Sequence, residues 1–558
     1  MAFRKMITGF EWIFFNRGAT VLDFLGDNYV VLLPIAGALI FAPIIYFWAR
    51  EARGEGPPEV MEAVATRGGR IRTRVALIKA LASSICIGSG GSVGREGPIV
   101  QIGASVGSTI AQWLRMPEGW VKTLLLCGAA GGISATFNAP IGGVMFALEV
   151  LQRRFVPGNL VPMVISAVTA AVVAHQFLGT EPSFVIPPYT MASHWEILPY
   201  MILGILCAFA ALGFVRFFYK AEDMFGVLHI PGYLKPALGA IVVGVIGMYY
   251  FDVFGTGYGE SYGLGGEVIF AGGVDKALAG GLVWDTLLIL LTLKMLATSA
   301  TLGSGGSGGV FAPSLFLGAM LGGAFGIAVY KLVPGITSPF MNETSGAYAL
   351  VGMGAFFAAT VHGPITAILL LFEMTRNYEL ILPLMSAVVV STLVARSISR
   401  ESIYSLRLVR RGIDIQRRDV YDLLSVIRVS DVMTRDFPGI LPSTPVSDLI
   451  NMLHDSGHHG FPIVDEDGNF VGIVTLEDVE AAMPRRDETL TAGDIGNKSP
   501  IVAYPGQSIH DALAKFEGRD VGRIPVVERN NPKKLVGVLR RHDITRAYTK
   551  ALGRRVVR

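Results

Sequence analysis

The chain has 558 residues, of which 51% are hydrophobic and only 16% are charged. A soluble globular protein usually carries about 25% charged residues, so the composition excludes an ordinary soluble protein over the whole length. The formal net charge of +3 is small, and we expect no nucleic-acid partner.

Apolar runs fill most of residues 30–395, whereas residues 396–558 have the composition of a soluble protein. A helix that spans a membrane needs about 20 apolar residues. The candidate spans are residues 30–48, 160–178, 197–215, 238–251 and 287–297. Several are too short, or too interrupted by Gly and Pro, to cross as simple rods. The chain is therefore predicted to be a multi-pass membrane protein.

Basic residues cluster at 67–74 and at 395–418, and the positive-inside rule places such segments in the cytoplasm. The three cysteines, Cys86, Cys127 and Cys207, all lie in apolar segments. We expect them to be small packing residues rather than members of a disulfide framework.

Two glycine-rich stretches repeat within the apolar region, GSGGSVGREGP at 88–98 and GSGGSGGVFAP at 303–313. A shift of 215 residues superposes them, and it also superposes Lys79 on Lys294. The membrane region therefore consists of two halves of one ancestral unit. An odd number of crossings per half would invert one half relative to the other, as in many secondary transporters.

A second pair of similar segments, 128–149 and 352–373, ends in Glu149 and Glu373. Because these glutamates occupy equivalent places in the two halves, we expect a structural role for both. We expect the equivalent lysines, Lys79 and Lys294, to extend toward water near helix ends.

Each glycine-rich loop precedes a Pro that suits the first turn of a helix. Glycine allows consecutive N–H groups to converge, and the N-terminus of a helix attracts an anion. Two such loops are therefore predicted to hold one anion from both sides. Only the first carries a charge, Glu96, whose counterpart is Phe311. Since an ionisable residue inside a membrane is functional by default, we predict that Glu96 acts in transport.

Three motifs in this order resemble the CLC family of chloride channels and proton-coupled chloride exchangers. They are GREGP at 94–98, GGVFAP at 308–313 and FEMTRNYELILPL at 372–384. The resemblance covers roughly residues 30–410. It implies an all-α membrane domain of two inverted repeats with short, tilted and broken helices, and a homodimer with one anion pathway per subunit. It also implies cytoplasmic termini, with residues 1–29 as a cytoplasmic N-terminal segment, in a protein of a prokaryotic plasma membrane.

The resemblance assigns roles to individual residues. Glu96 would be the gating glutamate, whose carboxylate competes with the anion and carries a proton. The backbone N–H groups of Val310 and Phe311 would hold the central anion, and the Tyr404 hydroxyl would reach the same ion. Glu181 would accept protons from the cytoplasm. The alternatives are a loop glutamate at Glu181 and an interfacial aromatic anchor at Tyr404.

The sequence departs from the family in its first motif, which typically reads Gly-Ser-Gly-Ile-Pro and supplies a serine hydroxyl to the anion. Here the segment is Gly54-Glu55-Gly56-Pro57-Pro58. A carboxylate donates no hydrogen bond unless it is protonated, and its charge repels chloride. Glu55 therefore either faces the site in protonated form or turns into the aqueous vestibule. We expect the vestibule.

The tail resembles a tandem pair of CBS (cystathionine-beta-synthase-type) domains, an α/β module that often binds adenine nucleotides. A linker at 411–424 would precede the two units, at about 425–485 and 490–550, in which short strands alternate with helices. The alternative is a dimerisation module without a ligand.

In nucleotide-binding CBS units a Thr/Ser-x-x-Asp pattern commonly holds the ribose, and Thr475 and Asp478 fit it. The second unit has Arg540 in place of the Thr and keeps Asp543, and Arg540 or Arg541 would face a phosphate. The histidines in HDSGHH (454–459) lack the Cys or carboxylate partners of a metal site, so we expect no metal and no required cofactor.

The sequence thus predicts a transporter that exchanges chloride, or a similar small anion, for protons and is regulated by its tail. A passive CLC-type channel is the alternative if Glu181 carries no proton. A CBS-bearing divalent-cation transporter is disfavoured because the membrane region lacks an acidic cluster suited to a hard cation. An enzyme is disfavoured because no nucleophile–base pair is visible.

Overall fold

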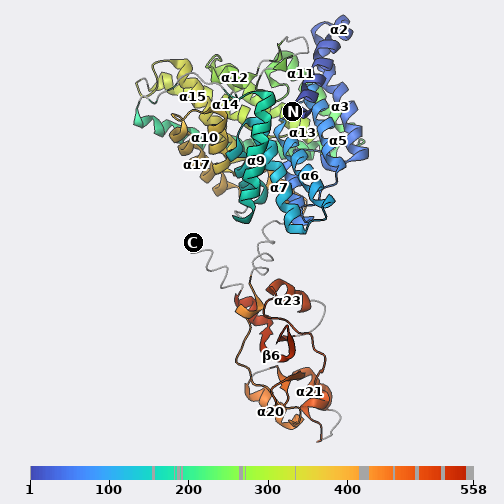
Figure 1. Cartoon of the computed structure of the whole chain (residues 1–558). Helices are drawn as coiled ribbons and strands as arrows, with labels where there is room; N and C mark the ends of the chain where they lie inside the picture. Colours follow the sequence, from blue (N-terminus) through green and yellow to red (C-terminus); the bar gives the residue numbers. More distant parts are fainter. Residues whose placement is uncertain are drawn as a thin grey trace. The chain divides into compact units, whose positions relative to one another are not determined.

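The chain folds into two compact units, Met1–Ile413 and Asp414–Arg558, called here the membrane unit and the tail unit (Figure 1). The computed structural model describes residues 2–547 except for 154–156, 181, 185–188, 190, 192, 260, 263–267, 271, 334, 414–426, 457–458, 484–488 and 517–521.

The membrane unit is built almost entirely of helices. Its first half contains α1 (Ala2–Glu11), η1 (Trp12–Arg17), α2 (Gly18–Leu22), η2 (Asp23–Asn28), α3 (Tyr29–Trp48), η3 (Arg50–Ala52), α4 (Pro57–Thr66), α5 (Arg74–Gly88), α6 (Glu96–Trp113), α7 (Glu118–Phe137), α8 (Pro140–Met145), η4 (Phe146–Gln152) and α9 (Pro157–Leu178). Its second half contains η5 (His194–Glu196), α10 (Ile197–Val227), α11 (Lys235–Tyr249), η6 (Phe251–Val253), α12 (Gly273–Leu278), α13 (Trp284–Gly303), α14 (Phe311–Leu332), α15 (Met341–Val361), α16 (Pro364–Thr375), α17 (Ile381–Ile398) and α18 (Ile403–Arg410). A short antiparallel hairpin, β1 (Ser261–Tyr262) and β2 (Val268–Phe270), precedes α12.

Among the described residues, eight helices are long and apolar enough to cross a membrane. Four of the five predicted spans lie entirely in helices, namely α3, α9, α10 and α13, and the span 238–251 extends two residues beyond the end of α11. Helices α5 and α11 have 15 residues each, about 22 Å at 1.5 Å per residue, which is shorter than the ~30 Å hydrocarbon core. The membrane unit therefore combines full spans with broken ones.

The two glycine-rich loops meet at the centre of the membrane unit. Gly94 N donates to Gly309 O and Gly309 N donates to Gly94 O, both at 2.7 Å. Because these residues are related by the repeat shift, the pseudo-two-fold axis passes between them. Irregular backbone inside a membrane needs such internal partners, since no water is available there.

Two buried lysines support equivalent loops on either side of this axis. Lys79 Nζ donates to the carbonyls of Ala52 and Gly54 at 3.1 and 2.7 Å. Lys294 Nζ donates to the carbonyls of Val253 and Gly255, both at 2.9 Å. The prediction that these lysines extend toward water is wrong, because both are completely buried and loop carbonyls satisfy their donors.

The supported loops lie on opposite sides of this central contact, which makes the two halves an inverted pair. Ser307 Oγ donates to Ala52 O at 2.9 Å. Its repeat counterpart, Ser92 Oγ, donates to Val253 O at 2.8 Å. Each glycine-rich loop therefore contacts the lysine-supported loop on its own side of the axis.

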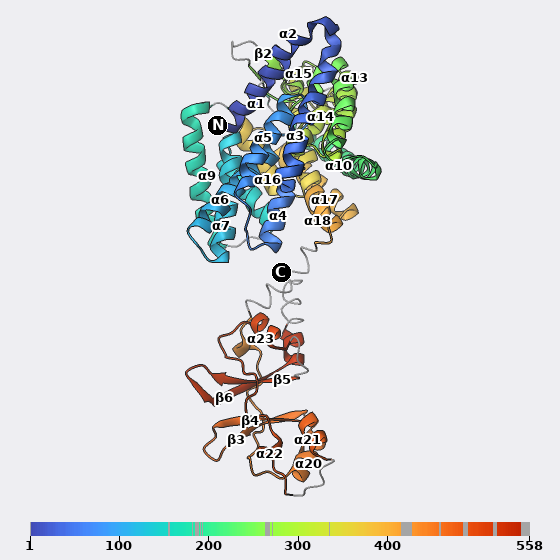
Figure 2. The same cartoon turned by 90° about the vertical axis from the view of Figure 1, so that its right-hand side faces the viewer.

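The end of the membrane unit that contains α18 is called here the α18 end (Figure 2). Helix α1 packs against α5, and Gly88, at the end of α5, abuts the backbone of Phe10 and Glu11.

Helices of each half pack closely through matched glycines. Gly103 of α6 faces Gly128 of α7, and Gly318 of α14 faces Gly352 of α15. At each of these positions a Cβ atom would overlap the carbonyl of the facing glycine. Small residues allow helix backbones to approach in this way. The three cysteines are buried and unpaired, as predicted.

The tail unit consists of two halves, each with its own antiparallel hairpin and core. The first contains η7 (Val429–Asp431), α20 (Val446–Ser456), β3 (Gly460–Val464), β4 (Phe470–Thr475) and α21 (Leu476–Ala482). The second contains α22 (Ala492–Ile495), α23 (Ile509–Phe516), β5 (Arg523–Glu528) and β6 (Asn531–Arg540).

The halves of the tail unit exchange their leading segments. Val429 packs in the core of the second half, and Thr434 pairs with Val538 of β6. Ala492 packs in the core of the first half, and Asn497 pairs with Ile473 of β4. Each half therefore completes the other, which explains why two units occur in tandem.

The close packing of α6 and α7 predicts that Gly103→Ala destabilises the protein. The added methyl overlaps the Gly128 carbonyl, and overpacking typically costs about 1–3 kcal/mol. We expect a lower thermal transition and a smaller monodisperse fraction in gel filtration. Gly213→Ala on α10 is the control, because nothing lies within 4 Å of its Cβ position and Ala favours a helix. Equal stability of the two variants would contradict the packing argument.

Candidate functional site

Three helices begin at the centre of the membrane unit. Helix α4 begins at Pro57 after Gly56, α6 begins at Glu96, and α14 begins at Phe311. The first N–H groups of a helix have no partner within it and carry its positive dipole end. Three such ends in one place form an environment suited to an anion.

Backbone contacts hold these three helix starts together. Gly54 N donates to Gly306 O at 3.0 Å. Gly97 packs directly on the Glu55 carbonyl, and a Cβ atom at Gly97 would lie 2.9 Å from Gly309 Cα. The structure thus brings the segment 54–56, the start of α6 and the start of α14 into one cluster, as the sequence predicted for an anion site.

Glu96 lies inside this cluster and is completely buried. Its Oε1 accepts a hydrogen bond from the Tyr258 hydroxyl, and Arg95 Nε lies 3.9 Å from the same oxygen. Its Oε2 has no hydrogen-bond partner among the described residues. A carboxylate held through one oxygen keeps the other available for a proton.

Tyr258, which donates a hydrogen bond to Glu96, is a site residue that the sequence analysis did not single out. It follows Gly255 and Gly257, which adopt positive φ values of 55° and 79°. Gly54 and Gly56 do the same, with φ values of 84° and 100°. The two Gly-x-Gly segments are thus inverted counterparts, and the pattern Gly-Thr-Gly-Tyr at 255–258 was the available signal.

Val310 and Phe311 precede and begin α14, and both are buried. The Phe311 ring packs on Phe137 and Phe357, with ring centroids 5.2 and 4.4 Å apart. The aromatic side chain is thus fixed in a hydrophobic cluster, and the backbone at this position adds no charge. The second half therefore lacks an equivalent of Glu96.

Tyr404 lies in the first turn of α18, which Ser402 caps together with Ser405. Its side chain is completely buried, and its hydroxyl has no hydrogen-bond partner among the described residues. This burial does not fit an interfacial anchor, and the role of the hydroxyl as a donor to the anion stays a prediction.

The expectation that Glu55 turns into an aqueous vestibule is wrong. The Glu55 side chain is 0% exposed, and its Oε1 accepts a hydrogen bond from Arg407 Nη1 at 2.7 Å. The unforeseen factor is Arg407, which is 352 residues away in the sequence and could not be paired with Glu55 by spacing. Its cationic side chain allows a carboxylate to remain buried.

Glu181 lies outside the described residues, and its role in proton acceptance stays a prediction. Of its described neighbours, Thr180 O accepts a hydrogen bond from Asn138, and Ser183 donates to Phe137 O.

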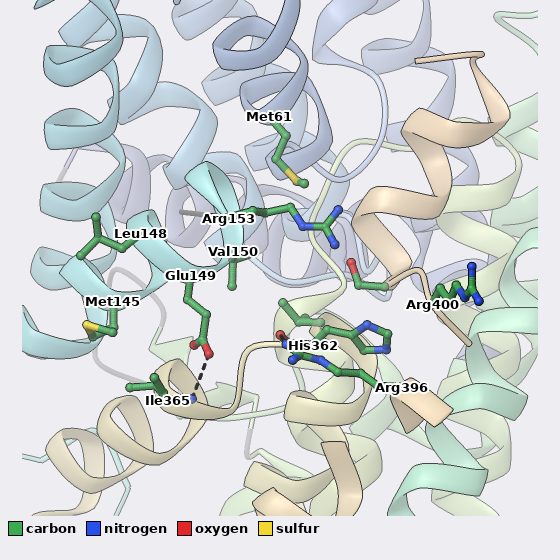
Figure 3. A pocket seen from close by; sticks show the side chains of 12 residues that line it. Met61, Met145, Leu148, Glu149, Val150, Arg153, His362, Ile365, Arg396 and Arg400 are labelled. Carbon is green, nitrogen blue, oxygen red and sulfur yellow. Dashed lines mark hydrogen bonds between the residues drawn. The ribbon is translucent and has the colours of Figure 1, made fainter. Parts of the chain in front are cut away.

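Glu149 and Glu373 each cap the start of a helix in the other half of the membrane unit. Glu373 accepts from the backbone N–H groups of Ile141 and Gly142 at the start of α8, at 3.0 and 2.6 Å. Glu149 accepts from those of Ile365 and Thr366 at the start of α16, at 3.2 and 2.7 Å (Figure 3). The predicted structural role is confirmed, and its physical form is the reciprocal capping of two helices.

A cavity of about 480 Å³ opens beside Glu149 at the α18 end. Figure 3 shows Arg153, Arg396 and Arg400 converging on it with His362. Its positive lining attracts anions from solution toward the membrane unit.

In the tail unit, the residues that were predicted to bind a nucleotide form hydrogen bonds with each other in two pairs. Thr475 Oγ1 donates to Asp478 Oδ2 at 2.7 Å, and the pair caps α21. Arg540 forms two hydrogen bonds with Asp543, at 2.8 and 2.9 Å. Arg540 also lines a cavity between the halves of about 60 Å³, whereas small-molecule pockets usually measure about 300–1,000 Å³. A nucleotide would therefore require the two halves to separate.

Comparison with known proteins identifies the family. The profile of the family described as voltage gated chloride channel matches residues 37–396. This chain belongs to that family. The CBS domain profile matches residues 429–485 and 492–550, which correspond to the two halves of the tail unit.

This chain aligns with bacterial relatives over most of its length. It is 34% identical over 388 residues to a putative chloride channel protein ClcB-like of Ralstonia nicotianae, covering 69% of the chain and 86% of the relative. It is 33% identical over 409 residues to the H(+)/Cl(-) exchange transporter ClcA of Vibrio campbellii, covering 72% and 82%.

Solved structures share the fold. A slow cyanobacterial Cl-/H+ antiporter aligns with a TM-score of 0.64 at 24% identity, over 75% of this chain and 95% of the antiporter. A eukaryotic CLC transporter aligns with a TM-score of 0.61 at 20% identity, over 97% and 94%. The membrane unit therefore has the CLC fold of two inverted halves, and the tail unit is a tandem CBS module.

The contact between Tyr258 and Glu96 predicts that Tyr258→Phe increases anion flux at neutral pH. A hydrogen bond to a charged group contributes about 1.5–3 kcal/mol, so its loss should release the carboxylate and increase flux roughly tenfold. The measurement is chloride efflux from liposomes. Tyr200→Phe is the matched control, since Tyr200 bonds Tyr189 and makes no contact with Glu96. Equal efflux from both variants would show that Tyr258 does not restrain the carboxylate.

Proposed function

We propose that this protein exchanges chloride for protons across a membrane, and that Glu96 takes part in both movements. The observation that carries the proposal is the burial of Glu96 where α4, α6 and α14 begin, with Oε2 free of a partner among the described residues. The name of the 33% identical relative, an H(+)/Cl(-) exchange transporter, supports this activity.

The exchange follows from the charge of Glu96. Two unit charges about 4 Å apart repel by about 4 kcal/mol at an effective dielectric of about 20, so a chloride and the ionised carboxylate exclude each other. A proton on Oε2 neutralises the side chain and allows it to leave the helix starts. The N–H groups of Val310 and Phe311 and the Tyr404 hydroxyl then hold the chloride. Departure of the anion lets the carboxylate return and release its proton.

The protein is further proposed to be a homodimer in a bacterial plasma membrane, with an anion pathway in each subunit and the tail unit in the cytoplasm. The resemblance to CLC proteins and the bacterial relatives support this arrangement. We propose no nucleic-acid partner. A passive chloride channel is the competing function, and a measurement of proton coupling distinguishes the two.

Glu96→Gln should preserve chloride flux and abolish coupled proton movement, because an amide resembles the protonated carboxyl but releases no proton. The measurement is proton uptake into liposomes driven uphill by a chloride gradient, recorded together with chloride flux. In the unmodified protein, flux should increase as pH falls, since protonation frees the site. Uphill proton movement by the variant would reject the role of Glu96, and its absence from the unmodified protein would favour the channel.

Glu181→Gln provides a second arm of the same assay. The resemblance predicts that proton movement stops while chloride still crosses. An unchanged ratio of protons to chloride would assign the cytoplasmic proton step to another group and favour a loop role for Glu181.

We also propose that an adenine nucleotide binds between the halves of the tail unit, near Arg540, and alters transport. A ligand regulates only by binding two conformations with different affinity, and the small cavity between the halves supplies a closed conformation. Titration of the full chain with ATP, ADP and AMP in a calorimeter should give heat, and Arg540→Gln should reduce it. No heat at about millimolar ligand, near the weak limit of useful affinities, would leave a purely structural module.

A further inference from the structure

A buried ion pair occupies the place where the resembled motif has a neutral hydroxyl. Besides its contact with Glu55, Arg407 donates through Nη2 to Glu222 Oε1 at 3.0 Å. The Arg407 side chain is 8% exposed. Because a buried charge is stable only when it is compensated, Glu55 and Arg407 have to be considered as one unit.

This pair borders the anion pathway. The Glu55 carbonyl packs on Gly97, which follows Glu96. Glu55 Oε2 is buried and has no hydrogen-bond partner among the described residues, and its charge acts on the Tyr404 hydroxyl. An anion at the helix starts therefore experiences the charges of both members of the pair.

We propose that Arg407 is a specificity-determining residue of this pathway, which permits anion binding by cancelling the charge of Glu55. The inference rests on the proposed transport function. A lone carboxylate would repel chloride, and a lone guanidinium would hold it too tightly. A compensated pair satisfies both needs of a transport site, in which binding must be strong enough for entry and weak enough for exit.

Other ionisable groups surround Glu55, but they do not replace Arg407. They are Arg53 in the preceding loop, Glu59 on α4, Lys79 on α5, Tyr219 and Glu222 on α10, and Tyr404 on α18. Lys79 donates to loop carbonyls, and Glu59 pairs with Arg411. Among the described residues, Arg407 is the cation within ion-pair distance of Glu55.

The experiment compares chloride binding by four full-length proteins, the unmodified chain, Arg407→Gln, Glu55→Gln and the double variant, by calorimetry. At about pH 9, where even a buried carboxyl is ionised to a useful extent, Arg407→Gln should weaken chloride binding at least about tenfold, since one uncompensated charge a few ångströms away is worth that much. Glu55→Gln should bind chloride at least as tightly as the unmodified chain. The chloride affinity of the double variant should return to within about threefold of that of the unmodified chain, because its pathway is again neutral.

The pH dependence of chloride binding distinguishes an effect of charge from an effect of misfolding. A proton on the unpaired Glu55 would cancel its charge, and burial favours that neutral form, so Arg407→Gln should regain most of its chloride affinity as the pH falls from about 9 to about 5. The double variant retains Glu96, Glu59 and Glu222 but not Glu55, so it measures the pH effect of those groups. Glu222→Gln removes the other partner of Arg407 and should change chloride affinity by less than about threefold, because the Glu222 side chain is partly exposed to solvent, which screens its charge.

Arg407→Lys keeps the charge and should retain chloride binding, which provides a test if Arg407→Gln is recovered poorly. The proposal is overturned if the double variant binds chloride as weakly as Arg407→Gln at about pH 9, if Arg407→Gln binds normally at that pH, or if Arg407→Lys loses binding while monodisperse. Because the readout is binding and not proton coupling, a passive channel would refute the proposed exchange without affecting this result.

Discussion

The reciprocal hydrogen bonds between Gly94 and Gly309 are the contact on which the membrane unit depends. In a membrane, a loop that leaves the helical conformation must find partners for its peptide groups within the protein. Here each glycine-rich loop is the partner of the other, and the lysines of α5 and α13 support the adjoining Gly-x-Gly segments. The helix starts can therefore point inward without exposing unsatisfied backbone to lipid.

This central contact also explains how one symmetric frame performs an asymmetric task. The backbone repeats on both sides of the axis, but the side chains at equivalent positions differ. Glu96 places a carboxyl group at the start of α6, whereas Phe311, at the start of α14, packs among aromatic rings. The two halves supply equivalent helix starts, and only one of these two positions carries a charged side chain.

Much of this arrangement was predictable from the sequence, because repeated motifs report on local backbone. The shift that relates Lys79 to Lys294 revealed the two halves, and the glycines and prolines located the helix starts. Contacts between distant side chains were not predictable. Nothing in the spacing of Glu55 indicates Arg407, and a Tyr after Gly257 does not by itself indicate a bond to Glu96. The lysines were misjudged because burial of their ammonium groups depends on carbonyls from other segments.

The reciprocal caps formed by Glu149 and Glu373 have a consequence for the origin of this architecture. Each carboxylate completes a helix that belongs to the other half, so neither half can satisfy its own helix end. A single ancestral unit would have met the same requirement by pairing with a second, oppositely oriented copy of itself. After the two copies were joined in one gene, the shared contact kept them together while the residues around Glu96 and Phe311 diverged.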